Sequence, residues 1–201
     1  MFGQNRILFR CLSAVGFSCL AACSALNTGK NAPAITLLEP ESLKLSFSGK
    51  GSAAGVMLVG SMGPMGIAVG VAIDEGIAKD IRTAFDNAGY SLLDFTQTQL
   101  QEALALRCKN TDTPPLAWLC SGPLSINIDR LGFRLVSGEQ DPAAPVFAFT
   151  LAATDAAASV SRHCVFPDYS VPLEQLKNTG ESTAAALSSA INACFENELS
   201  D

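Results

Sequence analysis

The sequence predicts an α+β fold, a two-layer sandwich in which one mainly antiparallel sheet carries helices on one face. Two observations predict it. Segments in which every second residue is apolar alternate with segments of helical periodicity, and their order is strand, helix, strand, helix, three antiparallel strands and helix. An uncharged, glycine-rich insert over residues 51–73 belongs to neither layer. We expect a single domain over residues 37–201, long enough to bury its own core.

The first half of the domain is predicted to alternate strands with helices. Residues 43–47 alternate apolar and polar side chains, which is typical of a half-buried strand. After the insert, apolar residues recur at helical spacing over 73–88, and Gly89 is placed to end that helix. Residues 90–95 are predicted as a strand. A second helix is expected over 96–108, because its first residues, Thr-Gln-Thr-Gln, have the pattern of a capping box.

The second half is predicted as three antiparallel strands and a helix. Residues 124–135 indicate one bent strand, because the apolar alternation slips at Asp129 as it does across a β-bulge. Residues 147–151 and 160–166 are predicted as the next two strands. The apolar spacing over 184–199 predicts a final amphipathic helix.

The amino terminus resembles the signal sequence of bacterial lipoproteins. Two arginines precede an apolar run, and Leu20-Ala21-Ala22-Cys23 has the apolar residue, the two small residues and the cysteine of a lipobox. The resemblance implies that residues 1–22 are a signal peptide and that Cys23 carries the lipid, palmitate included. Because Ser24 follows and not aspartate, it also implies the outer membrane, with the domain on the periplasmic face. The small and polar residues of 23–36 then predict a flexible tether.

Charge and motif spacing argue against nucleic acid, nucleotides and other cofactors. Loss of residues 1–22 removes two of the 13 basic residues and none of the 19 acidic ones, so the net charge changes from −6 to −8. Such a chain is a poor partner for nucleic acid. Gly49-Lys50-Gly51 with Gly55 follows a predicted strand, but the spacing is neither that of a dinucleotide fingerprint nor that of a phosphate-binding loop.

Four of the seven cysteines belong to the mature domain once the signal and the acylated residue are set aside. An even number in an oxidising compartment favours disulfides over free thiols, and the chain has no C-x-x-C pair that would favour zinc. Three pairings are possible. We favour Cys108 with Cys120, which closes a proline-rich loop, and Cys164 with Cys194, which joins a strand to the last helix.

The glycine-rich insert allows two interpretations. As one helix, residues 53–73 would reach about 31 Å, close to a hydrocarbon core. However, Gly63-Pro64 lies in the middle, which favours a kinked hairpin or a mobile loop over one straight span. Many glycines also occur in flexible loops and tightly packed backbone of soluble proteins. If the insert contacts a membrane or another copy, the small-xxx-small spacing gives these candidates: Gly51, Gly55, Gly66 and Gly70.

Parts of the domain resemble known envelope proteins in their order of elements. The helix, strand and helix expected over 77–106 look like the periplasmic domain of curli secretion-channel lipoproteins and the amino-terminal domain of the Tol-system translocation protein. The strand at 125–128 and the terminal helix are similar to small outer-membrane lipoproteins of the YajG type. These resemblances carry no catalytic residues, and the glycine-rich insert departs from them.

No pattern in the sequence indicates an enzyme. The one histidine, His163, lies in a predicted strand beside a disulfide cysteine, and no nucleophile elbow occurs. We therefore expect a non-enzymatic, membrane-anchored lipoprotein that acts in envelope assembly, transport or structure, through envelope proteins or copies of itself. The alternative is a periplasmic module for lipid or a small apolar ligand, with residues 55–73 as a lid or pocket wall.

Overall fold

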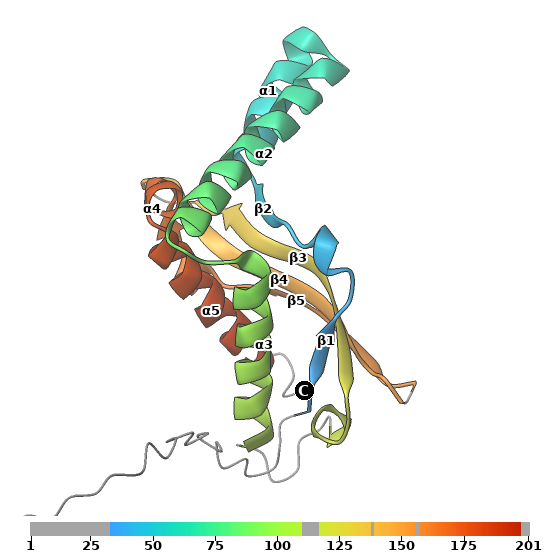
Figure 1. The fold of residues 1–201 in the computed structure, drawn as a ribbon. Coiled ribbons are helices and arrows are strands. Elements are labelled where there is room, and N and C mark those ends of the chain that lie inside the picture. The colour runs from blue at the N-terminus through green and yellow to red at the C-terminus, as the bar shows by residue number, and fades with distance from the viewer. Residues whose placement is uncertain (1–32, 110–116, 138, 156, 198–201) are drawn as a thin grey trace, which may run out of the picture.

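The computed structural model describes residues 33–109, 117–137, 139–155 and 157–197. They form a two-layer α+β sandwich from which one helical hairpin projects (Figure 1). Short 3-10 turns cover Pro40–Ser42, Ala117–Cys120 and Pro167–Tyr169. The helices and strands are β1 (Ile35–Leu37), β2 (Leu45–Ser48), α1 (Lys50–Met62), α2 (Pro64–Asn87), α3 (Leu92–Lys109), β3 (Leu124–Leu135), β4 (Pro142–Ala153), β5 (Ser159–Val165), β6 (Val171–Pro172), α4 (Leu173–Asn178) and α5 (Gly180–Asn197).

The sheet is mixed and is built on the long β3–β4 pair. Its order is β1-β3-β4-β5, with β2 also on β3 and β6 on β4. The pairings of β3, β4, β5 and β6 are antiparallel, whereas β1 and β2 run parallel to β3 and follow one another along its free edge. The register of β3 against β4 shifts between Ile128 and Arg130, which confirms the predicted bulge.

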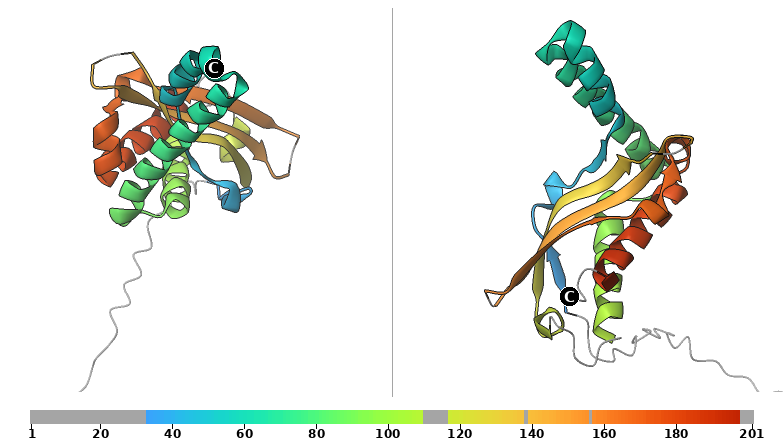
Figure 2. Two further views of the ribbon diagram at one scale, coloured as in Figure 1. Left: turned by 90° about the horizontal axis from the view of Figure 1, so that it is seen from above. Right: turned by 180° about the vertical axis from the view of Figure 1, so that it is seen from behind.

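The helices α3 and α5 cover one face of the sheet, and the carboxyl-terminal half of α2 joins them (Figure 2). Phe147 and Phe149 of β4 stack on each other, and Phe149 stacks on Phe195 of α5 with ring centroids 5.3 Å apart. Because these rings are fully buried, they hold the two layers together. The other large, fully buried side chains between the layers include Ile81, Phe85, Leu100, Leu104, Leu124, Ile126 and Phe133.

The strand predicted over residues 90–95 is wrong. α3 begins at Leu92, so only a short turn after Gly89 separates it from α2. The Asp94 N–H donates to Ser91 Oγ at 3.4 Å, so Ser91 opens the helix, and Thr96 is fully buried inside it instead of capping it. The aromatic residues at the two ends of this segment, Tyr90 and Phe95, pack their rings against Phe85.

The helix expected over 73–88 begins earlier, at Pro64, and the insert before it is also helical. Gly63 has a φ of 58°, and Pro64 occupies the first position of α2. These two residues turn the chain back on itself, so of the two predicted forms, a kinked hairpin or a mobile loop, the structure has the hairpin. Gly89 ends α2 with a φ of 86°, as predicted.

Both favoured disulfides are present. Cys108–Cys120 joins the end of α3 to the 3-10 turn before β3, and Cys164–Cys194 joins β5 to α5. β1, β6 and α4 were not expected from the sequence. Cys23 and most of the predicted tether lie outside the described residues.

Candidate functional site: the projecting hairpin

Glycine forms the contact surface between α1 and α2. Among the residues of the hairpin beyond its base, the buried ones are Gly51 and Gly55 on α1 and Gly66 and Gly70 on α2. A Cβ added at Gly51 would overlap the carbonyl oxygen of Gly70, and one added at Gly66 would lie 2.7 Å from the backbone of Leu58. The two helices therefore pack backbone against backbone. The four glycines predicted as membrane or oligomer contacts face one another within this chain.

Asp74 closes the base of the hairpin. Its side chain, on α2, accepts hydrogen bonds from the backbone N–H of Gly51 at 2.6 Å and of Gly49 at 3.2 Å. These are amides at the start of α1, which have no partner within their own helix. A carboxylate at this place also interacts favourably with the helix dipole. Asp74 thus caps α1 from the neighbouring helix.

A second contact fixes the base to the sheet. Lys50 Nζ and Asp141 Oδ2 lie 2.5 Å apart. This ion pair joins the first residue of α1 to the residue directly before β4. Both side chains are about half exposed, so this ion pair contributes little to stability by itself. α2 continues without interruption from the hairpin into the body, where Ile81 and Phe85 are fully buried. α2 thus connects the hairpin directly to the core.

The outer surface of the hairpin is apolar. Among the described residues, twelve large apolar side chains are exposed, and eight of them belong to the hairpin. Met57 is 83% exposed and Val56 is 76% exposed, values far above those of a core position. Monomeric soluble proteins rarely leave such a continuous apolar surface uncovered. The eight are Val56, Met57, Val59, Met62, Met65, Ile67, Val71 and Ile73.

The side-chain hydroxyls of the hairpin are satisfied within it. Residues 51–73 contain no charged side chain and two hydroxyls. Ser52 Oγ donates to the Gly49 carbonyl at 3.1 Å, and Ser61 Oγ donates to the Leu58 carbonyl at 3.2 Å. At the turn, the Gly63 N–H donates to the Val59 carbonyl and the Gly66 N–H to the Gly63 carbonyl. Both hydroxyls and these two amides of the turn therefore have partners inside the hairpin.

Two hollows lie near these elements. The first is a mostly apolar groove of about 310 Å³ along the hairpin, with Gly55 and Gly70 in its floor and Val56, Ile67 and Val71 at its sides. It lies on the projecting part of the molecule and not between the hairpin and the sheet. We call the contact formed by Gly51, Gly55, Gly66 and Gly70 the glycine seam. The groove exists because these glycines carry no side chains.

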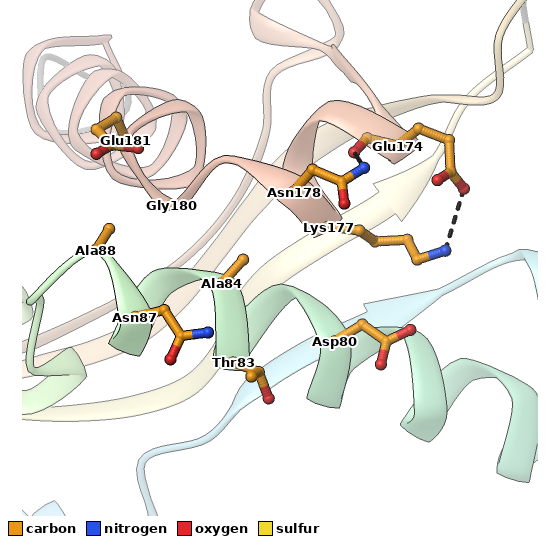
Figure 3. Close-up of a pocket in the computed structure, with 10 residues that line it drawn as sticks. All are labelled: Asp80, Thr83, Ala84, Asn87, Ala88, Glu174, Lys177, Asn178, Gly180 and Glu181. Atoms are coloured by element: carbon orange, nitrogen blue, oxygen red, sulfur yellow. Dashed lines mark hydrogen bonds and ion pairs between the residues drawn. The ribbon is translucent and has the colours of Figure 1, made fainter.

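The second hollow is a polar cleft of about 600 Å³ where α2 passes α4 and the start of α5 (Figure 3). Three carboxylates and one lysine give its lining an acidic balance, and the lysine pairs with Glu174 at 3.1 Å. The principal polar side chains of the lining are Asp80, Thr83 and Asn87 of α2, and Glu174, Lys177, Asn178 and Glu181.

The described residues contain no group of three side chains that could hold a metal ion. His163 is exposed on β5 and stands beside the disulfide cysteine Cys164. At the bulge, Asp129 accepts from Asn127 while Arg130 donates to Ser48, so these two charges face different partners. These residues do not converge on a common point where a substrate could react.

Comparisons with protein families, with curated proteins and with solved structures find no match to this chain. One pattern behind the resemblance to curli and Tol-system domains is absent, because residues 90–95 form no strand between α2 and α3. None of the described helices is long and apolar enough to cross a membrane.

Sequence reasoning found the glycine-rich segment but missed the role of Asp74. The signal that could have found it is a carboxylate at the first charged position after the uncharged stretch, opposite the start of α1 once the chain turns at Gly63. This pairing depends on the position of the turn and on the register of the two helices.

Proposed function

We propose that this chain is a lipid-anchored envelope lipoprotein without catalytic activity, and that its apolar hairpin is the surface through which it acts in envelope assembly or structure. The single observation that carries the proposal is the concentration of exposed large apolar side chains on α1 and the first half of α2. Each such side chain gains roughly 1.5–3 kcal/mol when it leaves water. We therefore expect another component of the envelope to cover this surface.

The lipobox supports the anchor and its location. Cys23 with its preceding Leu-Ala-Ala implies acylation, and Ser24 implies the outer membrane, with the domain on the periplasmic side. The two disulfides suit an oxidising compartment of that kind. The alternative function, a module that encloses a lipid or small apolar ligand, has less support because the hairpin projects away from the sheet and the apolar groove beside it is lined by α1 and α2 alone.

The anchor is tested by labelling cells with a palmitate analogue. We expect the wild-type chain to take up the label and to fractionate with the outer membrane, and Cys23→Ala to lose both properties. Cys11→Ala is the matched control, since it also removes a cysteine near the amino terminus but leaves the lipobox intact. Equal labelling of wild type and Cys23→Ala would contradict the proposed anchor.

The hairpin is tested with a photo-reactive amino acid at Met57, on α1, and at Tyr169, which is 42% exposed on the body of the domain. In intact cells we expect adducts with envelope components from position 57 and few from position 169. An absence of adducts at position 57, in a protein that is acylated and folded, would contradict the role of the hairpin.

A further inference from the structure

We infer that the hairpin enters the hydrocarbon of a single lipid leaflet, so that its covering partner is lipid and not a second protein surface. This inference rests on the proposed function and names the partner of its contact surface. The first argument is the distribution of apolar residues around each helix. Val56, Met57 and Val59 point in different directions on α1, and all three are exposed. Over residues 51–73, the positions that do not face the glycine seam are apolar or small.

An apolar surface on every side fits lipid better than a folded partner. A protein interface normally covers one face of a helix and leaves the opposite face polar, as in an amphipathic helix. A helix that is apolar all round is found either inside a core or in a membrane. The hairpin lies outside the core, as the two side views show (Figure 1 and the right view of Figure 2).

The length of the uncharged stretch matches one leaflet. From Lys50 to Met62, α1 rises about 18 Å, and from Pro64 to Ile73, α2 rises about 14 Å. Half of a hydrocarbon core is also about 15 Å thick. Charged side chains begin together at the base, with Lys50 on one helix and Asp74 and Glu75 on the other. The boundary between apolar and charged residues is therefore level across the two helices.

Hydrogen bonding within the hairpin is compatible with hydrocarbon. Backbone amides and carbonyls must find partners inside the segment that enters lipid, and helices satisfy that condition away from their ends. At the turn, the Gly63 N–H donates to the Val59 carbonyl and the Gly66 N–H to the Gly63 carbonyl. Pro64 lacks an N–H at a helix start, where a donor would have no partner within the helix. The hydroxyls of Ser52 and Ser61 both donate to carbonyls of the preceding turn.

The length of the tether permits both contacts on one bilayer. The chain from Cys23 to Pro33, ten residue steps, spans at most about 35 Å. Along β3, Ile35 lies beside Leu124 and Ser48 lies beside Arg134, so about 30 Å of strand separates the tether from the base of the hairpin. An acyl chain on Cys23 and the hairpin can thus reach the same leaflet.

The test measures the depth of the hairpin in vesicles of zwitterionic phosphatidylcholine that hold the full acylated protein. In a Trp118→Phe background, a single tryptophan is placed by Met62→Trp, by Met57→Trp or by Tyr169→Trp. Its fluorescence is then quenched with lipids brominated near the headgroup end or near the methyl end of the acyl chain.

We expect the tryptophan at position 62 to be quenched most strongly by the deep bromines. The one at position 57 lies five residues nearer the base, about 7 Å shallower, and is expected to be quenched more by the shallow bromines. Position 169, on the body, should stay unquenched. A further Met57→Lys change, in the variant that carries tryptophan at 62, should abolish the deep quenching, whereas Tyr169→Lys in the same variant should leave it unchanged.

Two results would overturn the inference. The first is no quenching at positions 57 and 62 by either lipid. The second is protection of both positions from lipid bromine and from aqueous iodide, together with an oligomeric mass, which would assign the hairpin to a second copy of this chain. Either result leaves palmitate labelling of Cys23 unaffected, so failure of this inference is distinguishable from failure of the proposed anchor.

Discussion

At the scale of single residues, glycine and aspartate determine how the hairpin closes. Gly51, Gly66 and Gly70 leave no room for a Cβ, whereas Gly60 has no other atom within 4 Å of that position. Asp74 then supplies the acceptor that the start of α1 lacks. Glycine therefore has different roles along α1: it is required for close packing at Gly51 but not at Gly60.

We expect Gly70→Ala to open the hairpin, because the added methyl group would overlap the Gly51 carbonyl. Forcing the helices apart costs about 1–3 kcal/mol. Amide hydrogen exchange measures this locally: the amides of α1 should exchange roughly 5 to 150 times faster, while those of β3 and β4 stay unchanged. Gly60→Ala is the control, and we expect it to slow exchange, since alanine is favoured over glycine in a helix by about 1 kcal/mol. Equal effects of both changes would contradict the glycine seam.

We expect Asp74→Ala to destabilise the start of α1 by about 1 kcal/mol, the typical cost of removing a capping side chain. The Gly49 and Gly51 amides, which now donate to this carboxylate, should exchange faster than in the wild type. Glu75→Ala removes the adjacent, exposed carboxylate and serves as the matched control. If both variants exchange alike at these two amides, the capping role of Asp74 is wrong.

At the scale of elements, the two disulfides contribute unequally to the stability of the fold. Cys164–Cys194 joins residues 30 apart and connects β5 to α5 across the core, whereas Cys108–Cys120 joins residues 12 apart near one end of α3. A cross-link that closes a longer loop removes more entropy from the unfolded chain. Cys164–Cys194 therefore links the sheet layer to the helix layer.

We expect the double change Cys164→Ser and Cys194→Ser to lower the free energy of unfolding by about 3.7 kcal/mol, and the corresponding change at Cys108 and Cys120 by about 2.9 kcal/mol. Two fully or nearly buried serine hydroxyls add to the first loss. Urea unfolding followed by circular dichroism measures both values. A larger loss for the pair at 108 and 120 would contradict this order.

At the scale of the whole molecule, the body folds around a core that does not include the hairpin tip, residues 56–69. α1 packs mainly on α2, while α2 alone continues to the sheet layer, α4 and α5. The core residues Ile81 and Phe85 follow the last apolar turn of the hairpin and belong to the body. The tip therefore adds exposed apolar surface without supporting the core.

We expect removal of residues 56–69, which joins Gly55 to Gly70, to leave the melting temperature of the body within a few degrees of the wild type. The shortened protein should need less detergent to stay monodisperse, because most of the exposed apolar side chains are gone. Thermal unfolding and light scattering measure these two properties. A collapse of the melting temperature would show that the tip supports the core.

Much of this fold was predictable because its signals are local. The bulge in β3, the strands β4 and β5 and the end of α2 at Gly89 follow from periodicity and turn signals. The two disulfide pairings are those we favoured among the three that the sequence allowed, and only the fold decides between them. The strand predicted over residues 90–95 failed for a physical reason. Apolar residues at that spacing fit a strand or a turn leading into a helix, and the aromatic cluster around Phe85 decides between them.

The sequence by itself determined the composition of the hairpin: an uncharged stretch, glycines four residues apart, and a turn at Gly63-Pro64. Only the tertiary structure decided which surface that stretch exposes. The glycines lie in the seam between the two helices, because backbone contact requires them there. The large apolar side chains consequently point outward. The alignment of Asp74 with the start of α1 was decided in the same way, since it depends on the register of two helices that meet only after the chain folds back.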